Sequence, residues 1–96
     1  PVSKFPSVKR DLSIVLDKNI RYNDLKEVAM KTERKLLKNV NLFDIYEGSK
    51  LGDSKKSYAL SFILQDESKT LTDKVIDKTM KRILAAFEQH FNAKLR

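Results

Sequence analysis

The chain has 96 residues, which suffices for one domain and falls well short of a typical catalytic unit of a synthetase, kinase or dehydrogenase. Lys and Arg number 20 against 13 Asp and Glu, so the net charge is +7 and nucleic acid is the first partner to consider. The lack of cysteine excludes disulfides, thiolate metal sites and cysteine nucleophiles, and one His cannot build a His-based metal cluster.

The N-terminus and the hydropathy of the chain indicate what kind of protein would contain this domain. No apolar stretch approaches the ~20 residues of a membrane-spanning helix, and the N-terminus has no apolar signal core. The chain begins at Pro1 rather than at Met. We therefore expect residues 1–96 to be one domain excised from a longer cytoplasmic protein, with no membrane partner.

The first part of the chain indicates a strand followed by a helix. Leu12, Ile14 and Leu16 alternate with residues that point the other way, which is the period of a strand over residues 11–16. Apolar residues then recur at helical spacing over residues 22–38, with Asn23 or Asp24 as the N-cap.

A predicted hairpin follows. Residues 40–46 form its first strand, with Phe43 and Ile45 on one face and Asp44 and Tyr46 on the other. A polar loop that contains both glycines joins this strand to a second alternating segment over residues 57–65.

The last part of the chain predicts a second helix and an edge strand. Thr70 and Asp73 fit a capping box, and one apolar helical face follows, made of Ile76, Met80, Ile83, Leu84, Phe87 and Phe91. Residues 92–96 allow a final edge strand. The order β-α-β-β-α-β predicts an α+β ferredoxin-like sandwich, with two helices on one face of a four-stranded antiparallel sheet.

Alternation divides the predicted sheet into a core face and an open face. The core set under the helices is Leu12, Ile14, Phe43, Ile45, Leu60, Phe62 and Leu64. The open set is Asp11, Ser13, Val15, Asp44, Tyr46, Ser57, Ala59, Ser61 and Ile63. Small residues beside one tyrosine ring would let a nucleic-acid base stack there, with Asp44 or Asp11 accepting from a base N–H.

Basic residues near the strand ends and the hairpin loop would then serve the phosphate backbone: Lys4, Lys9, Arg10, Lys50, Lys55, Lys56 and Arg96. Lysines on the second helix, such as Lys74, Lys78 and Lys81, are typical of a solvated helix surface. His90 has no partner at a spacing that would form a catalytic triad, so we expect no catalysis by these residues.

Several segments together carry a specific resemblance. They are Pro6-x-Val8-x-Arg10-Asp11-Leu12, Leu42-Phe43-Asp44-x-Tyr46-x-Gly48, Lys56-Ser57-x-Ala59, and Thr70-Leu71-Thr72-Asp73 with the terminal Leu95-Arg96. Over essentially its whole length the chain resembles the ferredoxin-fold anticodon-binding domain that ends the beta chain of bacterial-type phenylalanyl-tRNA synthetases.

The resemblance implies a binding site for the anticodon of tRNA(Phe). It implies that Tyr46 stacks on the first anticodon base, a guanine in the usual tRNA(Phe), that Ser13 bounds the other side of this base, and that Asp44 hydrogen-bonds to it. It also puts Ser57 among the RNA-binding residues, and it makes Arg10 and Lys56 candidates for phosphate or strand-end contacts.

For the parent protein, the resemblance implies phenylalanine–tRNA ligase activity, an alpha-chain partner, and ATP and Mg²⁺ bound outside this fragment. The alternative from the residues alone is a non-catalytic ferredoxin-like module that docks on a neighbouring domain or senses a small ligand.

Overall fold

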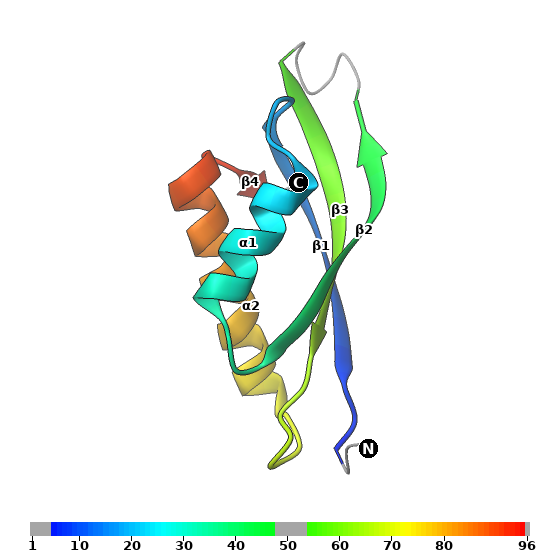
Figure 1. Cartoon of the computed structure of the whole chain (residues 1–96), viewed down its shortest axis with the longest axis vertical. Coiled ribbons are helices and arrows are strands. Elements are labelled where there is room, and N and C mark those ends of the chain that lie inside the picture. Colours follow the sequence, from blue (N-terminus) through cyan, green and yellow to red (C-terminus); the bar gives the residue numbers. More distant parts are fainter. Residues whose placement is uncertain (1–4, 48–53, 96) are drawn as a thin grey trace.

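The computed structural model describes residues 5–47 and 54–95, and its elements follow the predicted order (Figure 1). The strands are β1 (Val8–Asp17), β2 (Leu37–Tyr46), β3 (Lys55–Leu64) and β4 (Lys94–Leu95), and the helices are α1 (Tyr22–Thr32) and α2 (Asp73–Phe91). All strand pairs are antiparallel, in the order β2-β3-β1-β4. This arrangement confirms the predicted ferredoxin-like α+β fold.

Both helices pack on the same face of the sheet, and the core lies between them and the strands (Figure 1). The Phe62 and Phe87 rings, from β3 and α2, lie 6.3 Å apart between centroids. Burial of each large apolar side chain stabilises the fold by about 1.5–3 kcal/mol. The buried apolar residues are Ile14, Leu16, Leu25, Ala29, Leu37, Val40, Tyr58, Leu60, Phe62, Leu64, Ile76, Ile83, Phe87 and Ala93.

The prediction that Phe43 faces the helices is wrong, because β2 contains an irregularity in its register. Leu42 pairs with Leu60 whereas Asp44 pairs with Ala59, so Phe43 is an extra residue on β2, as in a β-bulge. The extra residue breaks the alternation on which the prediction depended. Phe43 lines a hollow on the open face and is 57% exposed.

The prediction that Ile45 is buried is also wrong. Ile45 pairs with Tyr58 and so keeps the orientation of the core face. It lies on β2, which is an edge strand of the sheet, and is 49% exposed. Strand alternation predicts the face of a side chain but not whether a helix covers it there.

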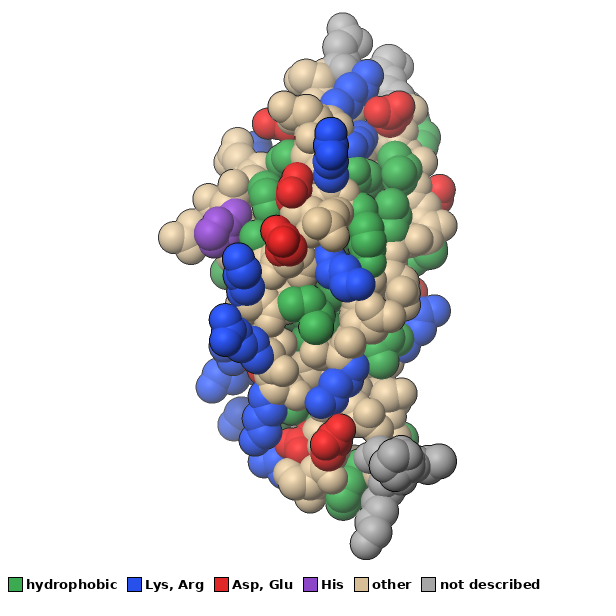
Figure 2. All heavy atoms as spheres, viewed as in Figure 1, with side chains coloured by type: hydrophobic (Ala, Val, Ile, Leu, Met, Phe, Trp, Pro, Cys, Tyr) green, Lys and Arg blue, Asp and Glu red, His purple; other side chains and the backbone are tan. Residues whose placement is uncertain are grey.

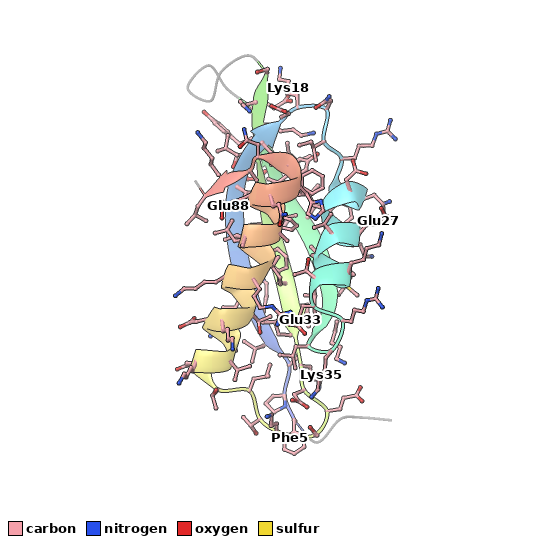
Figure 3. The ribbon with its side chains drawn as sticks, turned by 90° about the vertical axis from the view of Figure 1, so that its left-hand side faces the viewer. Phe5, Lys18, Glu27, Glu33, Lys35 and Glu88 are labelled. Atoms are coloured by element: carbon pink, nitrogen blue, oxygen red, sulfur yellow. The ribbon has the colours of Figure 1, made fainter. Side chains whose placement is uncertain are left out.

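The first helix is shorter than predicted, ending at Thr32, and β2 begins at Leu37. A contact from the second helix holds this end, because the Arg82 guanidinium donates to the Glu33 carboxylate at 2.9 Å and to the backbone carbonyl of Thr32 at 3.1 Å. Glu33 lies between the two helices (Figure 3). Helical periodicity within one segment cannot reveal such a tertiary contact.

The helix caps also differ from the predicted ones. Arg21 is the N-cap of α1, rather than Asn23 or Asp24, and the Asp24 carboxylate accepts from the Arg21 backbone N–H at 3.2 Å. Thr72, rather than Thr70, caps α2, where its hydroxyl accepts a backbone N–H of the first turn at 3.3 Å. Each helix begins close to its predicted start, and the exact cap is displaced by two or three residues.

The remaining predictions on the fold concern the hairpin and the last strand. β2 and β3 pair antiparallel as predicted, and β4 pairs with β1 along its edge. The two glycines of the hairpin loop, Gly48 and Gly52, and three of the basic residues expected to contact the phosphate backbone, Lys4, Lys50 and Arg96, lie outside the described residues. Within residues 5–47 and 54–95, no helix has the length and apolar character needed to cross a bilayer.

Candidate nucleic-acid interface

The sheet face turned away from the helices, called the open face below, carries small and polar side chains as predicted. Directly paired residues of antiparallel strands share a face, so the strand register identifies its members. They include Lys9, Asp11, Ser13 and Val15 of β1, Asn41, Asp44 and Tyr46 of β2, and Ser57, Ala59, Ser61 and Ile63 of β3. The nine residues that alternation assigned to the open face are therefore all there.

A hollow of about 220 Å³, called the sheet hollow below, lies on this face and is lined by Ser13, Phe43, Asp44, Tyr46, Ser57 and Ala59. β1 and β3 contribute small residues, and β2 contributes two rings and a carboxylate. Pockets for whole drug-sized ligands span about 300–1,000 Å³. The smaller sheet hollow suits one flat polar group, and it brings together four of the predicted site residues, Ser13, Asp44, Tyr46 and Ser57.

Two aromatic rings line the sheet hollow, although the sequence predicted one. Tyr46 is 40% exposed and Phe43 is 57% exposed, so both rings have surface available to a ligand. Ser13 and Ala59 pair directly and contribute no bulk beside them. A planar base could thus approach the sheet backbone and still contact a ring.

Asp44 supplies the carboxylate of the sheet hollow. Its Oδ1 accepts from the Ile45 backbone N–H at 2.9 Å, which restrains the side chain at the rim of the strand. Within the described part of the chain, no hydrogen bond is made to its Oδ2. A carboxylate oxygen in this position can accept N–H groups of a base edge.

The other acids on the open face are already partnered. The Asp11 carboxylate accepts from the Ser61 hydroxyl at 2.7 Å, and Asp17 forms an ion pair with Lys55 at 2.7 Å. Neither acid lines the sheet hollow. Of the two acids considered from the sequence as base acceptors, the geometry therefore favours Asp44 over Asp11.

Arg10 and Lys56 do not line the sheet hollow. Arg10 pairs with Phe62 and so belongs to the face that the helices cover, and its guanidinium donates to the Lys9 carbonyl at 3.1 Å. The Lys56 ammonium lies 4.5 Å from the centroid of the Tyr58 ring, which is part of the core. A phosphate contact by either residue stays a prediction.

Sequence reasoning missed Lys94 on the open face. Lys94 of β4 pairs with Val15 of β1 and is exposed, so it adds a cation to this face beside the strand that carries Ser13. The pairing of a two-residue strand leaves no periodic signal in the sequence. For Phe43 a signal did exist, since a hydrophobic residue next to the polar Asp44 could have been assigned to either face if a bulge had been considered.

A larger hollow of about 520 Å³ lies on the outer surface of α2 and is lined by Lys74, Asp77, Lys78, Lys81, Arg82 and Ala85. Figure 2 shows Lys and Arg side chains gathered at the lower left, where Figure 1 places the first half of α2. No aromatic ring lines this hollow. Its charges can attract a polyanion, but they offer no surface for base stacking.

The turn after β3 holds a carboxylate with a perturbed pKa. The Ser68 hydroxyl and the Ser68 backbone N–H donate to Asp66 Oδ1 at 2.7 and 2.8 Å, and these hydrogen bonds lower the pKa of Asp66. Asp66 follows the end of β3 that pairs with Val8, away from the sheet hollow. Across the described residues, no three His, Asp or Glu side chains are grouped so that they could hold a metal ion.

Comparisons with known proteins identify the family of this chain. A family model described as "Ferredoxin-fold anticodon binding domain" matches residues 3–96. The chain is 55% identical over 95 residues to the phenylalanine–tRNA ligase beta subunit of Bacteroides thetaiotaomicron, and 47% identical over 93 residues to that of Porphyromonas gingivalis. These matches cover 99% and 97% of this chain but only 12% and 11% of the length of the relatives. With a family match over nearly its whole length, the chain belongs to the ferredoxin-fold anticodon-binding domains.

Proposed function

We propose that this domain binds the anticodon of tRNA(Phe) on the open face of its sheet, with one base held in the sheet hollow. The observation that carries the proposal is the grouping of Ser13, Asp44, Tyr46 and Ser57 around a hollow sized for one flat polar group. Membership in a family of anticodon-binding domains supports the same role. The name of the relatives, phenylalanine–tRNA ligase beta subunit, supports tRNA(Phe) as the RNA.

In this proposal the hollow recognises the base by stacking and by hydrogen bonding. Tyr46 stacks on one side of the base, and the small side chains of Ser13 and Ala59 admit it from the sheet side. Stacking on an aromatic side chain contributes about 1–3 kcal/mol per base. Asp44 accepts N–H groups from the base edge, which favours a guanine over a base that presents no donor there.

Cations outside the hollow attract the RNA backbone. Lys9 and Lys94 are exposed on the open face, and the net charge of +7 favours encounter with any polyanion. These charges carry no information about base identity. Affinity therefore depends on salt, and discrimination depends on the sheet hollow.

The relatives imply a larger setting for this function. We place the domain in a cytoplasmic phenylalanine–tRNA ligase that works with an alpha chain and uses ATP and Mg²⁺ at sites outside this chain. This chain contributes selection of the tRNA and no catalytic residue. The domain spans 12% of the length of the Bacteroides relative, and we assign the ligase chemistry to the remainder.

The proposal is tested by titrating the chain with an anticodon stem-loop of tRNA(Phe) at several salt concentrations. Tyr46→Ala should weaken binding by about 1–3 kcal/mol, whereas Tyr46→Phe, which keeps the ring, should retain most of the affinity. Ile45→Ala is the matched control, because Ile45 is the preceding residue and has the orientation of the core face. The apparent affinity of all variants should fall steeply as salt rises.

Equal affinities for the wild type, Tyr46→Ala and Ile45→Ala would rule out the sheet hollow as the base site. An affinity that does not change with salt concentration would instead favour docking on a neighbouring protein domain, since salt does not screen a mainly apolar contact. A thermal shift with free amino acids and no effect of RNA would favour a ligand-sensing domain.

A further inference from the structure

Phe43 is the most unusual side chain on the open face. It is more exposed than Tyr46, although phenylalanine carries no polar atom that would gain from contact with water. Exposed apolar residues are common singly, but this ring adjoins a second exposed ring and a carboxylate around one hollow. An exposed ring at the edge of a polar hollow is available for contact with a ligand.

The backbone directs Phe43 into this position. Alternation counted back from Ile45 would turn Phe43 toward the helices, and the register irregularity between Leu42 and Asp44 ends that alternation. Bulges are frequent beside functional sites, where they redirect a side chain. The same irregularity places Asp44 directly opposite Ala59, so one local feature positions both the ring and the acid.

The spacing along β2 determines how the two rings could act. Two regular steps of β2 separate Asp44 from Tyr46, and Phe43 is the extra residue before them, so the two rings start roughly 7 Å and at most about 10 Å apart along the strand. Stacked neighbouring bases lie only about 3.4 Å apart. The two rings therefore fit two neighbouring bases that are splayed apart, as sequence-specific RNA recognition commonly requires, rather than two bases in one continuous stack.

We propose that Phe43 is a second stacking platform, which holds the anticodon base next to the one held by Tyr46. The inference rests on the proposed function and extends it from one recognised base to two. The continuity of Phe43 with the sheet hollow favours a base over an apolar protein surface, because the lining beside the two rings is polar or small: Ser13, Asp44, Ser57 and Ala59.

The test uses the anticodon stem-loop of tRNA(Phe) with the fluorescent adenine analogue 2-aminopurine at the second anticodon position. Stacking on a ring changes its fluorescence, so the signal reports the surroundings of that base separately from overall affinity. Phe43→Ala should remove most of the change seen on binding and raise the Kd about 5- to 10-fold, the lower part of the range for a base-stacking ring. Phe43→Tyr keeps an aromatic ring and should retain both the fluorescence change and the wild-type Kd. Phe43→Leu lacks the ring and should retain neither.

Two controls separate stacking from folding and from general surface effects. Phe43 is exposed, so the thermal unfolding of Phe43→Ala should match that of the wild type. Ile45→Ala removes a similarly exposed apolar side chain from the same strand on the core face. It should change neither the fluorescence nor the Kd.

The outcomes distinguish this inference from the function on which it rests. If Tyr46→Ala weakens binding while Phe43→Ala leaves the fluorescence and the Kd unchanged, the second platform is wrong and the proposed function stands. Equal losses with Phe43→Ala and Ile45→Ala would also overturn the second platform. If neither Phe43→Ala nor Tyr46→Ala affects binding, both proposals fail.

Discussion

The two faces of one sheet divide stability from recognition. On the core face, β1 and β3 bury large apolar side chains such as Leu60 and Phe62 against both helices. On the open face the same strands present Ser13, Ser57 and Ala59, which are too small to cover the backbone. Because adjacent residues of one strand point to opposite faces, neighbouring substitutions should separate the two properties cleanly.

The largest expected effect tests the core face. Phe62 is fully buried and packs against Phe87 of α2, so Phe62→Ala leaves a cavity in the middle of the core. We expect a loss of about 3–5 kcal/mol in the free energy of unfolding, measured by urea denaturation. Ser61→Ala, on the open face one residue earlier, should cost far less. Similar losses for both variants would contradict the division between the faces.

The next effect tests recognition on the open face. Asp44→Asn removes the charge that accepts base N–H groups and adds an amide donor of its own. We expect binding of a stem-loop whose first anticodon base is guanine to weaken by about 1.5–3 kcal/mol, the range of hydrogen bonds to charged groups.

Base dependence is the control for this variant. A stem-loop with inosine at the first anticodon position lacks the exocyclic amine of guanine, so it should show a smaller difference between Asp44→Asn and the wild type. Unfolding by urea should be nearly unchanged. An equal loss for both RNAs would mean that Asp44 does not read the base edge.

A smaller effect tests the contact that ends α1. Arg82→Ala removes the partner of the Glu33 carboxylate, whose side chain is only 8% exposed, and a hydrogen bond to Thr32. Arg82 is itself about half exposed, so solvent screening limits the loss to about 1 kcal/mol in the free energy of unfolding. RNA binding should not change, because Arg82 is on the helix side. A fall in RNA affinity as large as that of Asp44→Asn would argue that the helix surface binds RNA.

The smallest effect concerns Asp66, far from the sheet hollow. Hydrogen bonds from the Ser68 hydroxyl and backbone N–H lower the pKa of Asp66 in the folded chain. The unfolded chain therefore takes up this proton first, and the stabilising contribution, present above the ordinary Asp pKa of about 4, is lost as pH falls through the lowered value. Asp66→Asn should flatten this acid limb in unfolding experiments between about pH 5 and 2, and Glu67→Gln is the control. An unaltered acid limb in Asp66→Asn would contradict the assignment.

Local patterning predicted most of this fold. The alternation of Leu12, Ile14 and Leu60 predicted both faces of the central strands, and the apolar period of α2 predicted its buried side. Apart from the helix caps, the errors came from features that depend on distant residues. The end of α1 depends on Arg82 from the other helix, and the register of β2 depends on its pairing with β3.

In the candidate site, too, local pattern predicted some residues and tertiary pairing determined the others. Ser13 and Ser57 sit on regular alternation, Asp44 and Tyr46 alternate with Ile45 beyond the register irregularity of β2, and the structure brings the four together around the sheet hollow. The face of Phe43 depends on a change of register that the pairing of β2 with β3 determines, and Lys94 required the pairing of a two-residue strand. What the sequence could not predict is therefore the part of the site that tertiary pairing creates.

Binding of RNA to the open face can be followed residue by residue by NMR. Backbone amide shifts would be followed while an anticodon stem-loop of tRNA(Phe) is added. We expect small shifts along α2 and the largest shifts on the residues that line the sheet hollow: Ser13, Phe43, Asp44, Tyr46, Ser57 and Ala59. Largest shifts on Lys74, Lys78 and Lys81, with the sheet hollow unchanged, would contradict it.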